Sequence, residues 1–309
     1  MINFRYHVVS LTAVFLALAI GVVVGTAALN GPVADSLKNT VDAVSKDNSN
    51  LRAQNNQLQE EINREEDFAT EAAPALISGK LAGRRLLVVV LPTGREYANG
   101  VVSMLTIAGA KITARLTVED RFFDPASNVD LLELADKASQ PIVPSSGLPL
   151  NSDGVETSSA LLGLALLEHT PQTTAADVTA VLTAYSKANY LAVDDGATGG
   201  AEATVVISGL PATDRDAAAK SQSAVMLASQ LGKTKPLVVA GDGNGDGNLV
   251  AAVRNDPFLV KNISTVDNAN TVQGQLVTAM ATAERVVQQR SGQYGLGAGS
   301  SSLIPKLAS

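Results

Sequence analysis

An uncharged apolar stretch near the N-terminus, VVSLTAVFLALAIGVVVGTAAL at 8–29, constrains this chain more than any other feature. Only Ser10, Thr12 and Thr26 interrupt its apolar run. A helix of this length extends ~33 Å, which is enough to cross the ~30 Å hydrocarbon core of a bilayer. Helices of soluble proteins are rarely apolar on every side, so a buried soluble helix is disfavoured. We therefore predict a transmembrane helix, acting as a signal anchor, over 8–29.

A cleaved signal peptide is the main alternative to an anchor. The apolar cores of signal peptides run ~7–15 residues and end at a small-x-small cleavage site. The stretch here is longer, and its end, GTAAL at 25–29, matches such a site only loosely. An uncleaved anchor is the better interpretation, and sequencing of the mature N-terminus separates the two.

Charges on either side of the span predict its orientation. Arg5 and the N-terminal amine precede it, whereas Asp35 is the first charged residue after it. Positive charge is retained in the cytoplasm, so residues 1–7 are expected inside and the rest of the chain outside, in the periplasm.

Two patterns predict a parallel homodimer. Gly21 and Gly25 have the Gly-xxx-Gly spacing that lets membrane helices approach closely. Residues 30–68 then show a heptad repeat, in which Asn48 and Asn55 at seam positions would fix the register of a parallel coiled coil. The alternative is an amphipathic helix packed on its own domain. The predicted dimer contacts are Gly21, Gly25, Leu37, Val41, Val44, Asn48, Leu51, Asn55, Leu58 and Ile62.

Residues 84–290 have the pattern of an α/β domain, preceded by a linker at 69–83 and followed by a Gly/Ser-rich tail at 291–309 that we expect to be disordered. The aliphatic run LLVVVL at 86–91 is typical of a strand buried on both faces of a parallel sheet. A helix at 96–108 and a strand at 111–118 complete a βαβ unit. Further strands are predicted at 190–193, 204–208, 236–240 and, at an edge, 260–263; further helices at 129–138, 161–167, 175–187, 214–231 and 270–289. The expected architecture is a three-layer α/β domain with a mostly parallel sheet.

Composition excludes several classes of function. The net charge is −7 and no basic stripe is present, so nucleic acid is not an expected partner. The chain has no Cys, which excludes disulfides and thiolate metal sites. The four Met and two His form no cluster with ligand spacing, and Met104, Met226 and Met280 are expected in helix cores.

The loop GDGNGDG at 241–247 is the one motif that suggests an ion. Asp242, Asn244 and Asp246 occupy the first, third and fifth positions of an EF-hand-like calcium loop, with Gly247 at the sixth. Val253 stands at the twelfth position in place of the bidentate Glu, so weak calcium binding and an exposed turn both remain open.

No enzyme signature is present. A Ser-His-Asp arrangement would have to use His169, and the sequence has no Gly-x-Ser-x-Gly elbow. Asp194 and Asp195 follow a predicted strand, where a catalytic position is possible in α/β folds, but a loop is the simpler interpretation. The loops at 92–95 and 241–247 lack the glycine spacing of nucleotide sites. We therefore expect neither catalysis nor a resident cofactor.

The opening MINFRYHVVSL, the AIGVVVG segment at 19–25, the Leu51/Leu58 heptads and the LVVVLP strand at 87–92 together resemble the mycobacterial copper transport protein B (MctB) family, which is related to the corynebacterial envelope protein SteB. The resemblance covers nearly the whole chain and carries no catalytic signature. It implies copper efflux through a pore in the outer envelope, with copper as the transported ion, and hence copper resistance.

The SteB relationship implies a second function, a single-span dimeric scaffold that binds an envelope protein partner controlling cell-wall hydrolysis or division. The sequence pattern does not agree equally well with the implied pore and the implied scaffold. A transmembrane β-barrel needs many strands of ~10 residues that alternate apolar and polar, whereas the predicted strands here are few, short and aliphatic. The strand pattern therefore does not support the outer-membrane pore that the family name implies.

Overall fold

The computed structural model describes residues 4–28, 31, 34–139, 147–169, 172–243 and 245–306. The chain divides into two compact units, 1–65 and 66–309. We call the second unit the head and describe each unit by itself.

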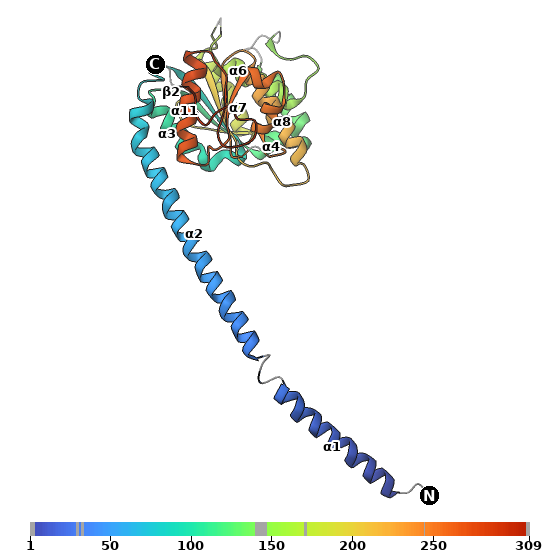
Figure 1. The fold of residues 1–309 in the computed structure, drawn as a ribbon. Coiled ribbons are helices and arrows are strands. Elements are labelled where there is room, and N and C mark those ends of the chain that lie inside the picture. Colours follow the sequence, from blue (N-terminus) through green and yellow to red (C-terminus); the bar gives the residue numbers. More distant parts are fainter. Residues whose placement is uncertain are drawn as a thin grey trace. The chain divides into compact units, whose positions relative to one another are not determined.

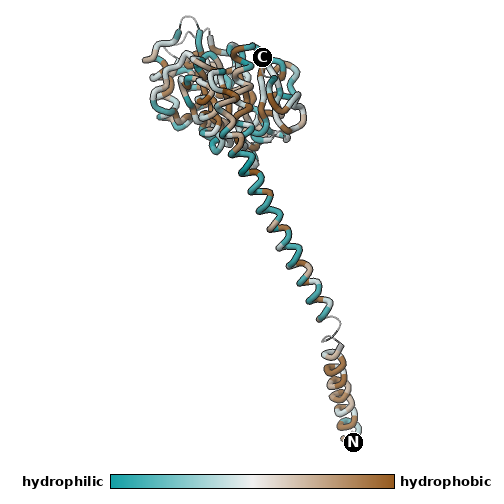
Figure 2. Tube along the Cα trace, turned by 60° about the vertical axis from the view of Figure 1, so that its left-hand side comes forward, coloured by the Kyte–Doolittle hydropathy of each residue, from teal (hydrophilic) through white to brown (hydrophobic). Residues whose placement is uncertain are grey.

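The first unit consists of helices. Helix α1 spans Phe4–Ala28, and within the described residues it holds the one segment, Phe4–Ala27, that is long and apolar enough to cross a membrane. Its colouring in Figure 2 is mostly brown, in contrast to the teal that predominates along α2. The hydroxyls of Thr12 and Thr26 donate to the carbonyls of Val8 and Val22, so these polar groups are satisfied within the helix, as hydrocarbon requires. The predicted N-terminal apolar helix is thus confirmed.

Helix α2 spans Ala34–Ile77, so the segment 69–83, predicted as a linker with a short helical piece, instead continues α2 over residues 69–77. The sequence suggested a break because Pro74 lies there, yet the helix continues through it. The reason is tertiary: Ala69, Ala73 and Ile77 follow one another at helical spacing and are buried in the head. The chain then turns at residues 78–84 before the first strand.

The head contains a seven-stranded sheet in the order β3-β2-β1-β4-β5-β6-β7. Every neighbouring pair is parallel except β2 and β3, which confirms the mostly parallel sheet. The strands are β1 (Arg85–Val90), β2 (Lys111–Val118), β3 (Leu191–Val193), β4 (Ala203–Ile207), β5 (Leu237–Ala240), β6 (Ile263–Val266) and β7 (Gln293–Tyr294).

Helices cover both faces of this sheet, as Figure 1 shows. One face packs against α5 (Asn128–Ser139), α6 (Gly154–Leu166), α7 (Ala175–Lys187), α8 (Ala217–Gly232) and α9 (Leu249–Asn255); the other packs against the end of α2, α3 (Arg95–Ile107) and α11 (Val272–Val287). The remaining short helices are η2 (Pro92–Gly94), α4 (Asp120–Phe123), η3 (Pro125–Ser127) and α10 (Leu259–Asn262).

The position of β1 in the sheet explains why its sequence is almost entirely aliphatic. Leu87 and Val89 enter the core on one face, whereas Leu86, Val88 and Val90 enter the core on the other. Because side chains alternate along a strand, a central strand covered on both faces needs apolar residues at every position.

Two predictions in the last third of the chain are wrong. The predicted edge strand at 260–263 is instead mostly the helical turn α10, and strand β6 begins at Ile263, inside the sheet. The Gly/Ser-rich tail expected to be disordered from Ser291 instead contributes β7, which pairs with β6 and forms the sheet edge.

A buried ion pair holds this tail in place. Arg254 Nη1 lies 2.7 Å from Asp267 Oδ2, and the two side chains are 3% and 2% exposed. Arg254 also donates to the carbonyls of Tyr294 and Ala298, while Asp267 accepts from the backbone N–H of Leu296. The composition of the tail could not predict that the tail is structured, because Arg254 and Asp267, which hold it, lie in other parts of the sequence.

Candidate functional site

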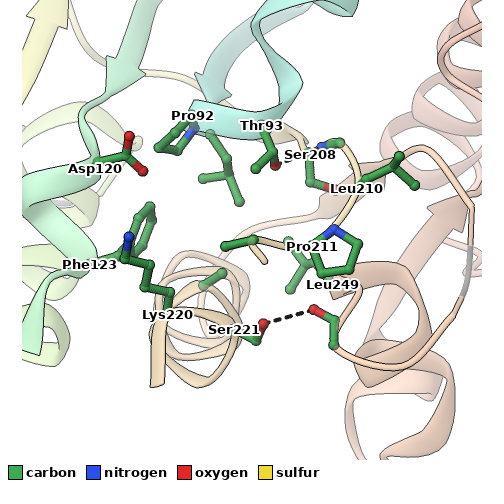
Figure 3. Close-up of a pocket in the computed structure, with 15 residues that line it drawn as sticks. Pro92, Thr93, Asp120, Phe123, Ser208, Leu210, Pro211, Lys220, Ser221 and Leu249 are labelled. Carbon is green, nitrogen blue, oxygen red and sulfur yellow. Dashed lines mark hydrogen bonds between the residues drawn. The ribbon is translucent and has the colours of Figure 1, made fainter. Parts of the chain in front are cut away.

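The pocket of greatest interest lies where strand order reverses in the sheet. The chain proceeds from β1 to β2 on one side and from β4 to β5 on the other, although β1 and β4 are neighbours. In open parallel sheets, ligands bind outside the carboxyl ends of the strands at such a switch point. A pocket of about 60 Å³ lies there, lined by the segments that follow β1 and β4 together with α4 and α8. Figure 3 shows these side chains.

Close backbone contact limits the size of this switch-point pocket. The backbone N–H of Gly209 donates to Thr93 Oγ1 over 3.0 Å. A Cβ on Gly209 would lie 1.9 Å from the Thr93 carbonyl oxygen, and one on Gly94 would lie 2.5 Å from that of Ile207. Only glycine permits this approach, which brings the two segments together over the strand ends. The pocket, at about 60 Å³, is far smaller than the ~300–1,000 Å³ of typical ligand sites.

The pocket has an apolar floor and charged groups at its edge. Leu91, Phe123 and Leu249 line it and are each at most 5% exposed. Lys220 Nζ lies 2.5 Å from Asp214 Oδ2, and this hydrogen bond raises the pKa of the Lys220 ammonium against the opposing effect of burial. The negative charge of Asp120, which also lines the pocket, adds to the effect.

Asp242, the first residue of the calcium-like loop, makes hydrogen bonds within the protein. Asp242 Oδ2 accepts a hydrogen bond of 2.8 Å from the Tyr97 hydroxyl, and its carbonyl accepts one from Asn248 Nδ2. Asp246 is exposed, and Asn244 lies outside the described residues. Across the part of the chain that is described, no group of three or more His, Asp or Glu side chains is arranged to hold a metal ion. Calcium binding stays a prediction.

The Tyr97–Asp242 contact has a measurable consequence at high pH. Burial, followed by the hydrogen bond to the Asp242 carboxylate, raises the pKa of Tyr97 from 10.0 to about 12. The folded chain therefore keeps this proton longer than the unfolded chain, and the stabilisation is lost as pH rises from 10.0 through about 12. We expect the phenolate absorbance difference between the native protein and Tyr97→Phe to titrate near the upper value. Asp242→Asn should shift that titration downward; a titration at the ordinary tyrosine pKa in the native protein would contradict this assignment.

His169, Asp194 and Asp195 do not come together as a site. His169 Nδ1 lies 3.0 Å from the Leu167 carbonyl oxygen. Asp194 lies 3.8 Å from Arg115, and Asp195 is exposed in the turn after β3. Met104 and Met280 are buried in the core, as predicted, and Met226 is partly buried against it.

The predicted dimer contacts lie on α1 and α2. Leu37, Leu51 and Leu58 are 65%, 64% and 59% exposed, and Asn48, Leu51 and Asn55 together line one shallow surface of α2. A Cβ on Gly21 or Gly25 would meet no atom of the described chain within 4 Å. An amphipathic helix packed on its own domain stays the alternative interpretation of the heptads. The dimer itself stays a prediction.

Sequence reasoning missed the switch-point pocket. The segments at 92–94 and 208–212 each follow an aliphatic strand, which was the available signal. Their proximity depends on β1 pairing with β4, a contact between strands separated by more than a hundred residues that no local pattern encodes.

The structure defines a class of protein with one candidate membrane-spanning helix and a doubly wound α/β head. A second long helix with an apolar heptad seam follows the first. Residues 1–305 match the family model described as "Copper transport outer membrane protein, MctB", and the chain belongs to this family. Among its relatives are proteins named copper transporter MctB. Those of Mycobacterium tuberculosis (strain ATCC 25618 / H37Rv) and Mycobacterium leprae (strain TN) are each 27% identical over 98% of this chain and 99% of their own length.

Proposed function

We propose that this chain is a copper transport protein of the cell envelope that acts in copper efflux and so confers copper resistance. The observation that carries the proposal is the family match over residues 1–305, which includes the apolar helix as well as the head. Copper is the transported ion in this proposal and not a resident cofactor.

The protein's own elements favour a role within an assembly over a pore made by one chain. A single apolar helix cannot enclose a water-filled channel. The strands of the head are buried under helices on both faces, whereas the strands of a membrane barrel alternate between lipid and lumen. We therefore propose that α1 anchors the chain in the envelope with the head in the periplasm, and that any pore includes further copies or partners.

Copper accumulation tests this proposal directly. A strain lacking the gene should accumulate several-fold more cell-associated copper under copper stress, because efflux is lost, and the full-length chain should restore the native level. The measurement is elemental mass spectrometry of washed cells, with zinc-stressed cells as the control. Unchanged copper content in the deletion strain would contradict the copper function. Membrane fractionation of the same cells, with sequencing of the mature N-terminus, separates an intact anchor from a cleaved signal.

A second candidate function is a non-enzymatic dimeric scaffold that binds an envelope partner controlling cell-wall hydrolysis or division. The heptad seam of α2 favours it, because apolar residues at this spacing are the pattern of a helix that pairs with a second helix. Deletion of Gly31–Arg64 distinguishes the candidates, with replacement by an equally long helix that lacks the apolar seam as the control for spacing. A scaffold should fail with either change, whereas a pore built elsewhere in the chain should survive both.

A further inference from the structure

The edge of the switch-point pocket carries charges of both signs. Asp120 and Lys220 both line the pocket, and they form no ion pair with each other. In Figure 3 they lie at one edge of the pocket, with Leu210 at the opposite edge. Among the residues that the structure describes, no hydrogen bond or ion pair engages the Asp120 carboxylate, so both of its oxygens are free to accept from a ligand.

Lys220 keeps hydrogen-bond donors for a ligand as well. Its ammonium group has three N–H donors, and the contact of 2.5 Å with Asp214 Oδ2 uses one of them. This hydrogen bond raises the pKa of Lys220, so the group is positively charged at neutral pH. The other N–H groups can therefore donate to a carboxylate, which lysine binds as a compact positive charge.

This pair of opposite charges distinguishes between classes of ligand. A ligand whose only charge is a carboxylate would pair with Lys220 but would lie beside the like charge of Asp120. A ligand whose only charge is an ammonium would pair with Asp120 but would lie beside the like charge of Lys220. A molecule that carries an ammonium and a carboxylate close together can satisfy both residues. The edge of the pocket therefore fits a zwitterion.

The interior of the pocket fits a short aliphatic group. Its floor is formed by Leu91, Phe123 and Leu249, which are each at most 5% exposed. A cavity of ~150 Å³ holds benzene, which has six carbon atoms, so a pocket of about 60 Å³ holds roughly three. An isopropyl group has this size, whereas a benzyl group is too large.

We propose that the switch-point pocket binds a small aliphatic α-amino acid such as valine, whose side chain contacts the apolar floor, whose ammonium pairs with Asp120 and whose carboxylate pairs with Lys220. Two independent features support this assignment. The pocket lies at the carboxyl ends of β1 and β4, where open parallel sheets bind ligands, and its lining combines opposite charges with an apolar floor. The inference goes beyond the copper and scaffold functions and depends on neither.

Equilibrium dialysis of the full-length chain in detergent micelles tests the proposal, with radiolabelled valine as the probe and empty micelles as the blank. L-valine and D-valine are measured separately, and at least one of them should bind. Isovalerate is valine without its ammonium, and isobutylamine is valine without its carboxylate. Each should compete at least about tenfold more weakly than unlabelled valine. Phenylalanine should compete as weakly, because its benzyl group exceeds the pocket.

Two variants test the charged residues one at a time. Asp120→Asn removes only a charge and should weaken valine binding about tenfold, as should Lys220→Met, which keeps the aliphatic stem. The matched controls are Asp195→Asn and Lys137→Met, which make the same changes in net charge outside the pocket. Both controls should bind valine as the native chain does.

The apolar floor is tested by Ala224→Leu, which should fill the pocket and abolish valine binding, with circular dichroism as the check that the head is folded. Binding no greater than that of empty micelles would overturn the proposal. So would competition by isovalerate and isobutylamine equal to that by valine, or equal losses in the control and pocket variants. Valine binding that persists in Ala224→Leu would place the ligand elsewhere and has the same consequence. The competitors and the charge variants leave the core unchanged, so they decide the matter even where Ala224→Leu does not fold.

Discussion

Replacement of Arg254 by alanine is expected to destabilise the head by about 3–5 kcal/mol, because it leaves the Asp267 carboxylate buried without a counter-charge. The two side chains are 3% and 2% exposed, so water cannot replace the lost partner. The same substitution removes the donors to the Tyr294 and Ala298 carbonyls, and strand β7 should lose its hold on β6. Denaturant unfolding of the full chain and hydrogen exchange at 293–302 measure the two effects.

Two further variants make this expectation specific. Lys137→Ala breaks an exposed ion pair with Glu133, at 75% and 64% exposure, and should cost well under about 1 kcal/mol. Arg254→Leu/Asp267→Leu removes both buried charges and should recover part of the loss. If Arg254→Ala proved as stable as Lys137→Ala, the buried pair would not be what holds the tail in place.

Substitution of Leu51 and Leu58 together by lysine is expected to abolish the proposed dimer. In a parallel coiled coil these positions face their counterparts, so each dimer would bury four like charges in its seam. In the single chain the two leucines are 64% and 59% exposed, so the substitutions should leave the fold of one chain unchanged. Asn50→Lys/Gln57→Lys adds the same charge on the outer face and should remain dimeric. Sedimentation velocity in detergent micelles measures the difference.

Disulfide trapping gives an independent readout of the same seam. The chain contains no Cys, so a single Asn48→Cys introduces the only thiol. It should form an interchain disulfide much faster than Asn50→Cys, because only the seam position meets its twin in a parallel pair. Equal rates, together with a monomeric native chain, would rule out the coiled-coil dimer and with it the scaffold as proposed.

Local sequence patterns predicted much of the fold because local physics determines those parts. The apolar run predicted as a helix forms most of α1, Phe4–Ala28, and a helix is the geometry that would satisfy the backbone groups of such a run in lipid. The runs that became β1, β4 and β5 were recognisable because strands buried on both faces need aliphatic residues throughout. Strand β2 has the predicted bounds, Lys111–Val118.

Local sequence patterns predicted much less of the candidate site. The loop spacing at 241–247 left weak calcium binding and an exposed turn open for Asp242, and it gave no indication that the Asp242 carboxylate accepts a hydrogen bond from Tyr97, a residue on another element. The switch-point pocket combines Thr93 and Gly209 with residues of α8, and no spacing in the sequence relates these positions.

Patterns within short segments predicted the apolar N-terminal helix, the heptad repeat of α2 and the aliphatic strands of an α/β head, because each pattern depends on neighbouring residues alone. Three features follow from contacts between distant segments: α2 continues through Pro74, the Gly/Ser-rich tail adds a strand, and two strand ends form a pocket. In each of these cases the stabilising contacts come from distant segments: the head core for Ile77, the Arg254–Asp267 pair for the tail, and β1–β4 pairing for the pocket. Burial and pairing with such partners outweigh local propensity. Local sequence therefore gave the wrong expectation for the end of α2 and for the tail, and it gave no indication of the pocket.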